Sequence, residues 1–218
     1  MPRAIFSTRR SFIAASACAT LALPLTLRPS GAATPGPTPR QSEGPFYPDA
    51  LPLDRDSDLL VFNGKRAMGQ PADVSGRVLD ARGRPLGGVS VEIWQCDALG
   101  YYKHVRGQTG GDPHFQGYGR TTAADDGSYR FRTIRPVPYG ARTPHIHFKL
   151  RGRGIDGLTT QLYIAGHARN AQDFLFTRIP ERLRARVTAA FEPGPDTEAA
   201  TARFDIVLGP DFVSDHDG

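Results

Sequence analysis

Cysteine is scarce in this chain of 218 residues, which has two, Cys18 and Cys96. Cys18 lies in an apolar N-terminal stretch that has the character of a removable signal, so the mature chain would keep Cys96 alone. One cysteine cannot form an internal disulfide, and the stability of the mature chain must therefore come from a buried core. We interpret Cys96 as a small buried hydrophobic residue.

Acidic residues are absent from the first 33 residues, although the whole chain has 22 Asp and Glu. The same segment holds four arginines, so its removal lowers the formal charge from +5 to 5 − 4 = +1. A nearly neutral mature chain gives no electrostatic reason to expect a nucleic acid partner. The longest apolar stretch, residues 13–27, is interrupted by Ser, Thr and Pro and is too short to span a bilayer.

The N-terminal segment instead has the features of a twin-arginine signal peptide. Arg9 and Arg10 precede the apolar stretch, and small residues follow at 31–33. We predict that residues 1–33 direct the folded protein to the periplasm or the exterior. The alternative, an apolar N-terminal helix of the domain, is opposed by the helix-breaking Pro24 and Pro29. Residues 34–42 are predicted to be a Pro-rich linker with nothing to bury.

Short alternating runs dominate the rest of the chain, and its 24 Gly and 19 Pro indicate many turns. Half-buried strands are predicted from this pattern at residues 74–80, 89–96, 128–134, 145–150, 159–164 and 203–208. The only helical pattern is at residues 180–191. We therefore predict an all-β fold, an antiparallel β-sandwich over residues 43–210 with one short C-terminal helix and long functional loops. Residues 211–218 form an acidic tail.

The strand at residues 145–150 carries His145 and His147. Side chains two apart in a strand point to the same face, so both imidazoles could bind one metal ion. Completion by carboxylates would indicate ferrous iron, and completion by a third His or a Cys would indicate zinc or copper. The nearby loops offer tyrosines instead: Tyr101, Tyr102 and Tyr139. A phenolate is a hard ligand suited to a trivalent ion, but a single Tyr or His is more often an ordinary structural residue.

Eight segments in order then resemble one family: residues 43–47, 76–80, 91–95, 100–104, 126–134, 144–148, 160–161 and 204–208. The family is the intradiol ring-cleavage dioxygenases, which includes the protocatechuate and catechol dioxygenases. The resemblance implies a β-sandwich that holds a non-haem Fe(III) ion. It also implies cleavage of a catechol-type ring between its two hydroxyls with O2, giving a muconate-type dicarboxylate. The partners would be a small aromatic diol and O2, with no nucleic acid and no membrane span after signal removal.

The same resemblance implies a set of site residues. The metal ligands would be Tyr102, Tyr139, His145 and His147, with Tyr102 rather than Tyr101 matching the family's first tyrosine. Tyr139 would also act in catalysis, leaving the metal and taking a proton as the diol binds. Two further catalytic positions match Arg142, which would stabilise negative charge on the substrate, and Gln161 beside the histidines.

The chain departs from the family pattern in one place, because only residues 140–144 separate Tyr139 from His145. The better-known members have a longer insertion there that helps to wall the substrate pocket. No helical dimerisation domain is expected ahead of the sandwich. Two alternatives stand beside the dioxygenase hypothesis: a non-catalytic transthyretin-like binding module, and a metalloenzyme that uses copper or ferrous iron on the same scaffold.

Overall fold

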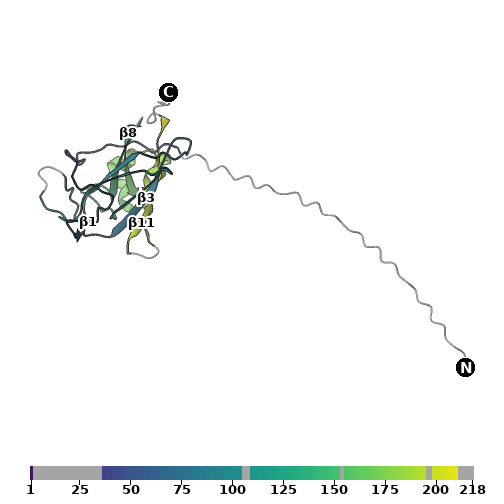
Figure 1. The fold of residues 1–218 in the computed structure, drawn as a ribbon, viewed down its shortest axis with the longest axis horizontal. Helices are drawn as coiled ribbons and strands as arrows, with labels where there is room; N and C mark the ends of the chain where they lie inside the picture. The colour runs from purple at the N-terminus through teal and green to yellow at the C-terminus, as the bar shows by residue number, and fades with distance from the viewer. Residues whose placement is uncertain (2–35, 105–108, 153–154, 195–197, 211–218) are drawn as a thin grey trace. The chain divides into compact units, whose positions relative to one another are not determined.

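The computed structural model describes residues 36–104, 109–152, 155–194 and 198–210, together with Met1 (Figure 1). The predicted signal peptide with Cys18 lies outside the described residues apart from Met1, and the acidic tail lies wholly outside them. Both assignments therefore stay predictions. Among the helices of the described part, none combines the length and the apolar character that crossing a membrane requires.

Two five-stranded sheets form the framework of the described chain (Figure 1). In the first sheet, strand β3 lies at the centre and pairs with β6, β11 and β12, while β10 extends the edge. The second sheet has the order β5-β4-β7-β8-β9. The first comprises β3 (Pro71–Leu79), β6 (Ser128–Ile134), β10 (Glu192–Pro193), β11 (Ala200–Arg203) and β12 (Ile206–Val207). The second comprises β4 (Ser90–Trp94), β5 (Tyr118–Thr122), β7 (His145–Gly152), β8 (Ile155–Ile164) and β9 (Thr188–Ala189).

One hydrophobic cluster is shared by the two sheets. Val74 and Phe131 enter it from the first sheet, and Ile93, Ile146 and Phe148 enter it from the second. The all-β prediction is thus confirmed, and the arrangement is consistent with a β-sandwich. The pairing is not wholly antiparallel, because β11 and β12 run parallel to β3 and β9 runs parallel to β8.

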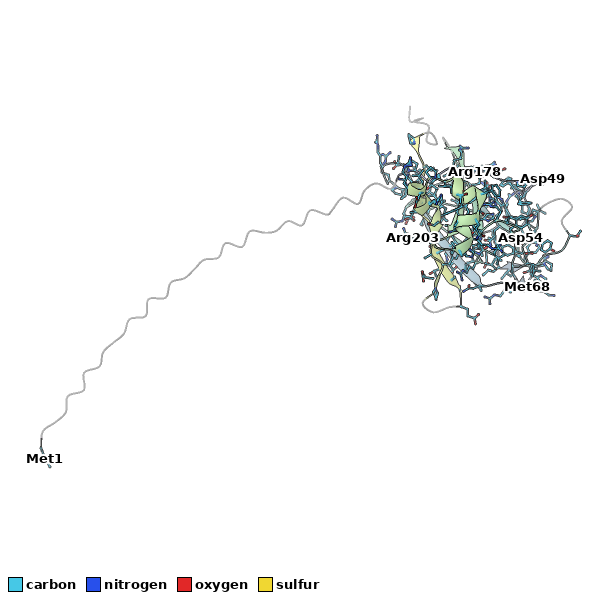
Figure 2. All side chains as sticks on the ribbon, turned by 180° about the vertical axis from the view of Figure 1, so that it is seen from behind. Met1, Asp49, Asp54, Met68, Arg178 and Arg203 are labelled. Atoms are coloured by element: carbon cyan, nitrogen blue, oxygen red, sulfur yellow. The ribbon has the colours of Figure 1, made fainter. Side chains whose placement is uncertain are left out.

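A small hairpin of β1 (Val61–Phe62) and β2 (Lys65–Arg66) lies in the segment before β3. Figure 2 shows this part of the chain, marked by Asp49, Asp54 and Met68, on the opposite side of the domain from Arg203. Strand β5, which starts at Tyr118, is not among the strands that the sequence predicted.

The helix predicted at residues 180–191 is in the right place but much shorter than expected. The structure has α2 (Glu181–Arg184) and a 3-10 turn (Ala185–Val187), after which the chain extends into β9. The helical pattern is overridden because Thr188 and Ala189 pair with the end of β8. Another short helix, α1 (Phe174–Arg178), was not predicted, and a 3-10 turn, η1 (Ala168–Gln172), precedes it. Both helices lie before the last strands.

The Pro-rich segment before the domain makes specific contacts from residue 36 onward. Thr38 is buried, its N–H donates to the carbonyl of Val207, and its hydroxyl accepts from the Val207 N–H. The Gln41 N–H donates to the carbonyl of Thr159 in β8. The expectation that this segment buries nothing is therefore wrong at Thr38, and the segment leads directly onto the second sheet.

Candidate metal centre

Strand β7 presents two faces of opposite chemistry. Ile146 and Phe148 point into the shared core, while His145 and His147 lie on the other face with their ring centroids 4.9 Å apart. Each histidine is only 2% exposed. Pairing with both neighbours fixes their place, because His147 lies opposite Trp94 of β4 and Gln161 of β8.

Two loop tyrosines reach the same point. The Tyr102 hydroxyl lies 3.2 Å from Nε2 of His145. The ring centroid of Tyr102 lies 5.2 Å from that of Tyr139 and 6.1 Å from that of His147. Tyr102 is buried, whereas Tyr139 is half-buried. The structure thus brings together the four side chains predicted as ligands. The neighbouring Tyr101 is 41% exposed.

Hydrogen bonds leave the imidazoles ready to bind a cation. Nδ1 of His145 lies 2.7 Å from the carbonyl of Thr143 and must donate to it, so its Nε2 keeps the lone pair that faces Tyr102. Both ring nitrogens of His147 are buried without a hydrogen-bond partner among the described residues. A buried, unpaired polar group destabilises the fold by about 1–3 kcal/mol. Coordination to a metal ion would satisfy one of these nitrogens.

Burial also sets the protonation of this cluster. Burial, together with the charge of Arg142, lowers the pKa of His145 to about 4. Burial, and then the neighbouring His145 and Arg142, lowers the pKa of His147 well below its usual range. Burial raises the pKa of the Tyr102 phenol well above its usual range. At neutral pH the imidazoles are therefore neutral, and a phenolate at Tyr102 requires a strong local positive charge.

The donor set does not suit zinc or a carboxylate-bound ferrous ion. Within the described ranges, no three side chains of His, Cys, Asp or Glu gather as a metal site. Cys96 is buried, and burial raises the pKa of its thiol to about 12, as expected of a small hydrophobic residue. Two imidazoles and two phenols remain, which fit a hard trivalent cation.

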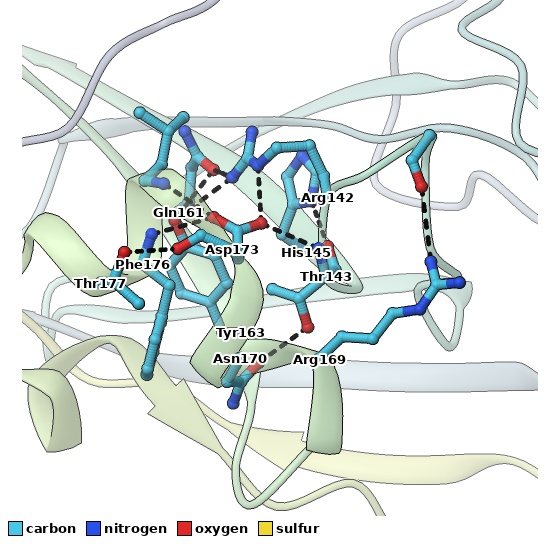
Figure 3. A network of polar contacts seen from close by, with 12 residues as sticks. Arg142, Thr143, His145, Gln161, Tyr163, Arg169, Asn170, Asp173, Phe176 and Thr177 are labelled. Atoms are coloured by element: carbon cyan, nitrogen blue, oxygen red, sulfur yellow. Dashed lines mark hydrogen bonds and ion pairs between the residues drawn. The ribbon is translucent and has the colours of Figure 1, made fainter.

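Arg142 and Gln161 meet beside His145 (Figure 3). Nη2 of Arg142 donates to Oε1 of Gln161 over 2.7 Å. The short connection at residues 140–144 allows this, because it closes as a turn in which the Arg142 N–H donates to the carbonyl of Tyr139. The short connection therefore places Arg142 beside the candidate ligands.

Sequence reasoning missed three contributors to the site. Asp173 is fully buried and binds Nε of Arg142; its position before α1 is a typical helix-cap signal that the sequence offered. Phe46 stacks on Tyr102 with ring centroids 4.3 Å apart. Trp94 stacks on His147 at 4.7 Å. Phe46 and Trp94 lie in segments that carried the family resemblance, but nothing in the sequence assigned them contacts.

Replacement of His147 by Leu should leave the metal-free protein as stable as the wild type or more stable, because it removes two unpaired buried nitrogens. The matched control is His104→Leu, since Nε2 of His104 donates to the carbonyl of Gln116 over 2.9 Å. The control should lose about 1 kcal/mol. Thermal unfolding of the three metal-free proteins measures this. An unfolding temperature that drops more for His147→Leu than for His104→Leu would show that His147 is an ordinary packed residue.

The comparisons with known proteins all find dioxygenases. A family model described as Dioxygenase matches residues 42–210. The chain is 37% identical over 183 residues to the protocatechuate 3,4-dioxygenase beta chain of Burkholderia cepacia, covering 78% of each protein. It is 30% identical over 166 residues to catechol 1,2-dioxygenase 1 of Acinetobacter lwoffii, covering 68% of this chain but 53% of that one.

Solved structures give the same result. The dioxygenase domain of a dioxygenase carbohydrate-binding protein fusion from Streptomyces sp. SirexAA-E aligns with a TM-score of 0.64 and 33% identity, over 79% of this chain and 98% of that one. Catechol 1,2-dioxygenase from Acinetobacter sp. ADP1 aligns with a TM-score of 0.63 and 26% identity, over 80% of this chain and 63% of that one. The chain therefore belongs to the intradiol ring-cleavage dioxygenase family.

Proposed function

We propose that this protein is a non-haem iron(III) dioxygenase that opens a catechol-type ring between its two hydroxyl-bearing carbons, placing both atoms of O2 in a muconate-type dicarboxylate. One observation carries the proposal: two neutral imidazoles and two phenols gather at a buried point where both nitrogens of His147 are unpaired among the described residues. Membership of the family supports it.

The residues fit ferric iron by charge as well as by donor type. His145 and His147 would contribute neutral nitrogens, and Tyr102 and Tyr139 would contribute phenolates that offset two of the three positive charges. When bound, the ion would supply the Lewis acidity that activates a chelated diol toward O2.

The two tyrosines differ in a way that suits different roles. Tyr102 is buried, stacked under Phe46 and close to His145, so it would stay in place. Tyr139 is half-buried and comes from the loop before β7. Its phenolate oxygen would accept a proton from the incoming diol, and the neutral phenol would then move away from the imidazoles.

Arg142 would supply fixed positive charge where the substrate becomes negative. Asp173, Gln161 and Tyr163 engage its Nε and Nη2, and Nη1 has no hydrogen-bond partner within the described part of the chain. Gln161 is itself oriented, because its Nε2 donates to the carbonyl of Ser42. Together these contacts leave Nη1 available to a bound diol.

A non-catalytic binding module would account for the two sheets but not for this cluster. A binding module does not need two imidazoles and two phenols at one buried point, because burial of such polar groups without partners destabilises the fold. The donor chemistry also opposes a copper or ferrous enzyme, because phenolates are hard anionic ligands.

Ring cleavage can be tested directly with the iron-loaded mature chain and a catechol. We expect one O2 consumed per ring and label from 18O2 at both new carboxyl groups, measured by oxygen electrode and mass spectrometry. Tyr102→Phe should lower kcat/KM at least about 100-fold, because a ligand is lost. Tyr101→Phe is the matched control and should stay within about twofold. Unlabelled product, or equal activity of the two variants, would contradict the proposal.

We also propose that the enzyme acts outside the cytoplasm, on the basis of the twin-arginine pattern at residues 1–33. Changing Arg9 and Arg10 together to Lys should keep the protein in the cytoplasm of a bacterium that has the twin-arginine pathway. Cell fractionation with immunoblotting measures this. Equal export of the altered and unaltered chains would contradict the assignment.

A further inference from the structure

We propose that Asp173 is a positioning residue for ring cleavage, whose carboxylate fixes the guanidinium of Arg142 beside the metal ligands. The catalytic part of this inference rests on the proposed function. The structural part, that Asp173 determines the orientation of Arg142, can be tested without turnover.

The two carboxylate oxygens of Asp173 accept hydrogen bonds from different parts of the chain. Oδ1 accepts the N–H groups of Leu175 and Phe176, both over 2.9 Å, and thereby caps helix α1. Oδ2 accepts Nε of Arg142 over 2.7 Å and the N–H of Thr143 over 2.8 Å. Oδ1 therefore caps the helix, whereas Oδ2 holds Arg142 through its side chain and through the N–H of the following residue, Thr143 (Figure 3).

This division goes beyond what a helix cap needs. A single side-chain oxygen from Ser, Thr, Asn or Asp is sufficient to cap a helix. Here the side chain is fully buried, and its second oxygen is taken up entirely by Arg142 and Thr143. A buried carboxylate is unfavourable unless it is paired and hydrogen-bonded, so its position points to the partner that it binds.

The contacts define the plane of the guanidinium. Asp173 binds Nε, and Gln161 binds Nη2 over 2.7 Å, so two points of a rigid planar group are fixed. The side chain of Arg142 is only 13% exposed. Without Asp173, a buried guanidinium would lack its counter-charge and would tend to turn toward solvent. The charge that Arg142 offers to a substrate would then be misplaced, which lowers turnover even when every ligand is present.

Asp173→Asn tests the roles of the two carboxylate oxygens separately. The amide oxygen can still cap α1, but the amide nitrogen cannot accept the hydrogen bonds from Arg142 and Thr143. We expect kcat/KM of the iron-loaded enzyme to fall by about 10- to 100-fold, as for the loss of a hydrogen bond to a charged group. If Asp173 acts through Arg142, adding Asp173→Asn to Arg142→Gln should change kcat/KM by less than about twofold. If the two substitutions instead lower kcat/KM in the double variant by the product of their separate fold-changes, the proposal would be overturned, because Asp173 would then act independently of Arg142.

Asp80 provides a matched control. It is a buried carboxylate in the turn after β3, its Oδ1 accepts the N–H groups of Arg82 and Arg84, and its Oδ2 accepts Nε of Arg84 over 2.6 Å. Asp80→Asn should lower the unfolding temperature but leave kcat/KM within about twofold. A fall in kcat/KM equal to that of Asp173→Asn would overturn the proposal, since any loss of a buried aspartate would then suffice.

The second readout needs no turnover. In the full mature chain without iron, the Nε–H of Arg142 should give a slowly exchanging signal in 1H–15N NMR, assigned by its loss in Arg142→Gln. Asp173→Asn should make it exchange rapidly, and a signal that stays protected would overturn the proposal. An inactive wild type with this loss of protection would reject the proposed function while supporting Asp173 as the residue that orients Arg142.

Discussion

Strand β7 carries core residues on one face and candidate ligands on the other, and its fixed register places everything else in the site. Ile146 and Phe148 lock it into the core between the sheets. The same pairing sets His147 opposite Trp94 and Gln161. A shift of one residue in the register of β7 would turn both histidines into the core and expose Ile146 and Phe148. The register that stabilises the fold is therefore also the register that brings the candidate ligands together.

Around this strand the protein keeps a dry cluster of polar groups. The imidazoles are held neutral and the Tyr102 phenol is held protonated by burial in the absence of a cation. Such an arrangement is unfavourable for the fold alone and becomes favourable when a highly charged ion enters. The Asp173–Arg142 pair brings two opposite charges to the neighbourhood of His145. Both features agree with the proposed metal centre.

The sequence predicted the parts of this arrangement that depend on local periodicity. The alternation of residues 145–150 predicted that His145 and His147 share a face, because a strand has a fixed period of two. The choice of Tyr102 and Tyr139 came from family resemblance, since nothing local brings two loops to one strand. Asp173 was missed because α1 is too short to show a helical period and its partner Arg142 is far away in the sequence. The helix expected at residues 180–191 ends at Arg184 because pairing of Thr188 and Ala189 with β8 outweighs local propensity.

The most direct test of the metal centre is a visible absorption spectrum of the purified mature protein loaded with ferric iron, before and after anaerobic addition of catechol. Charge transfer from Tyr102 and Tyr139 to iron(III) should colour the protein, and catechol should shift the band to longer wavelength as it binds and Tyr139 leaves. A protein that stays colourless after ferric reconstitution would contradict the assignment of the two tyrosines and two histidines as ligands.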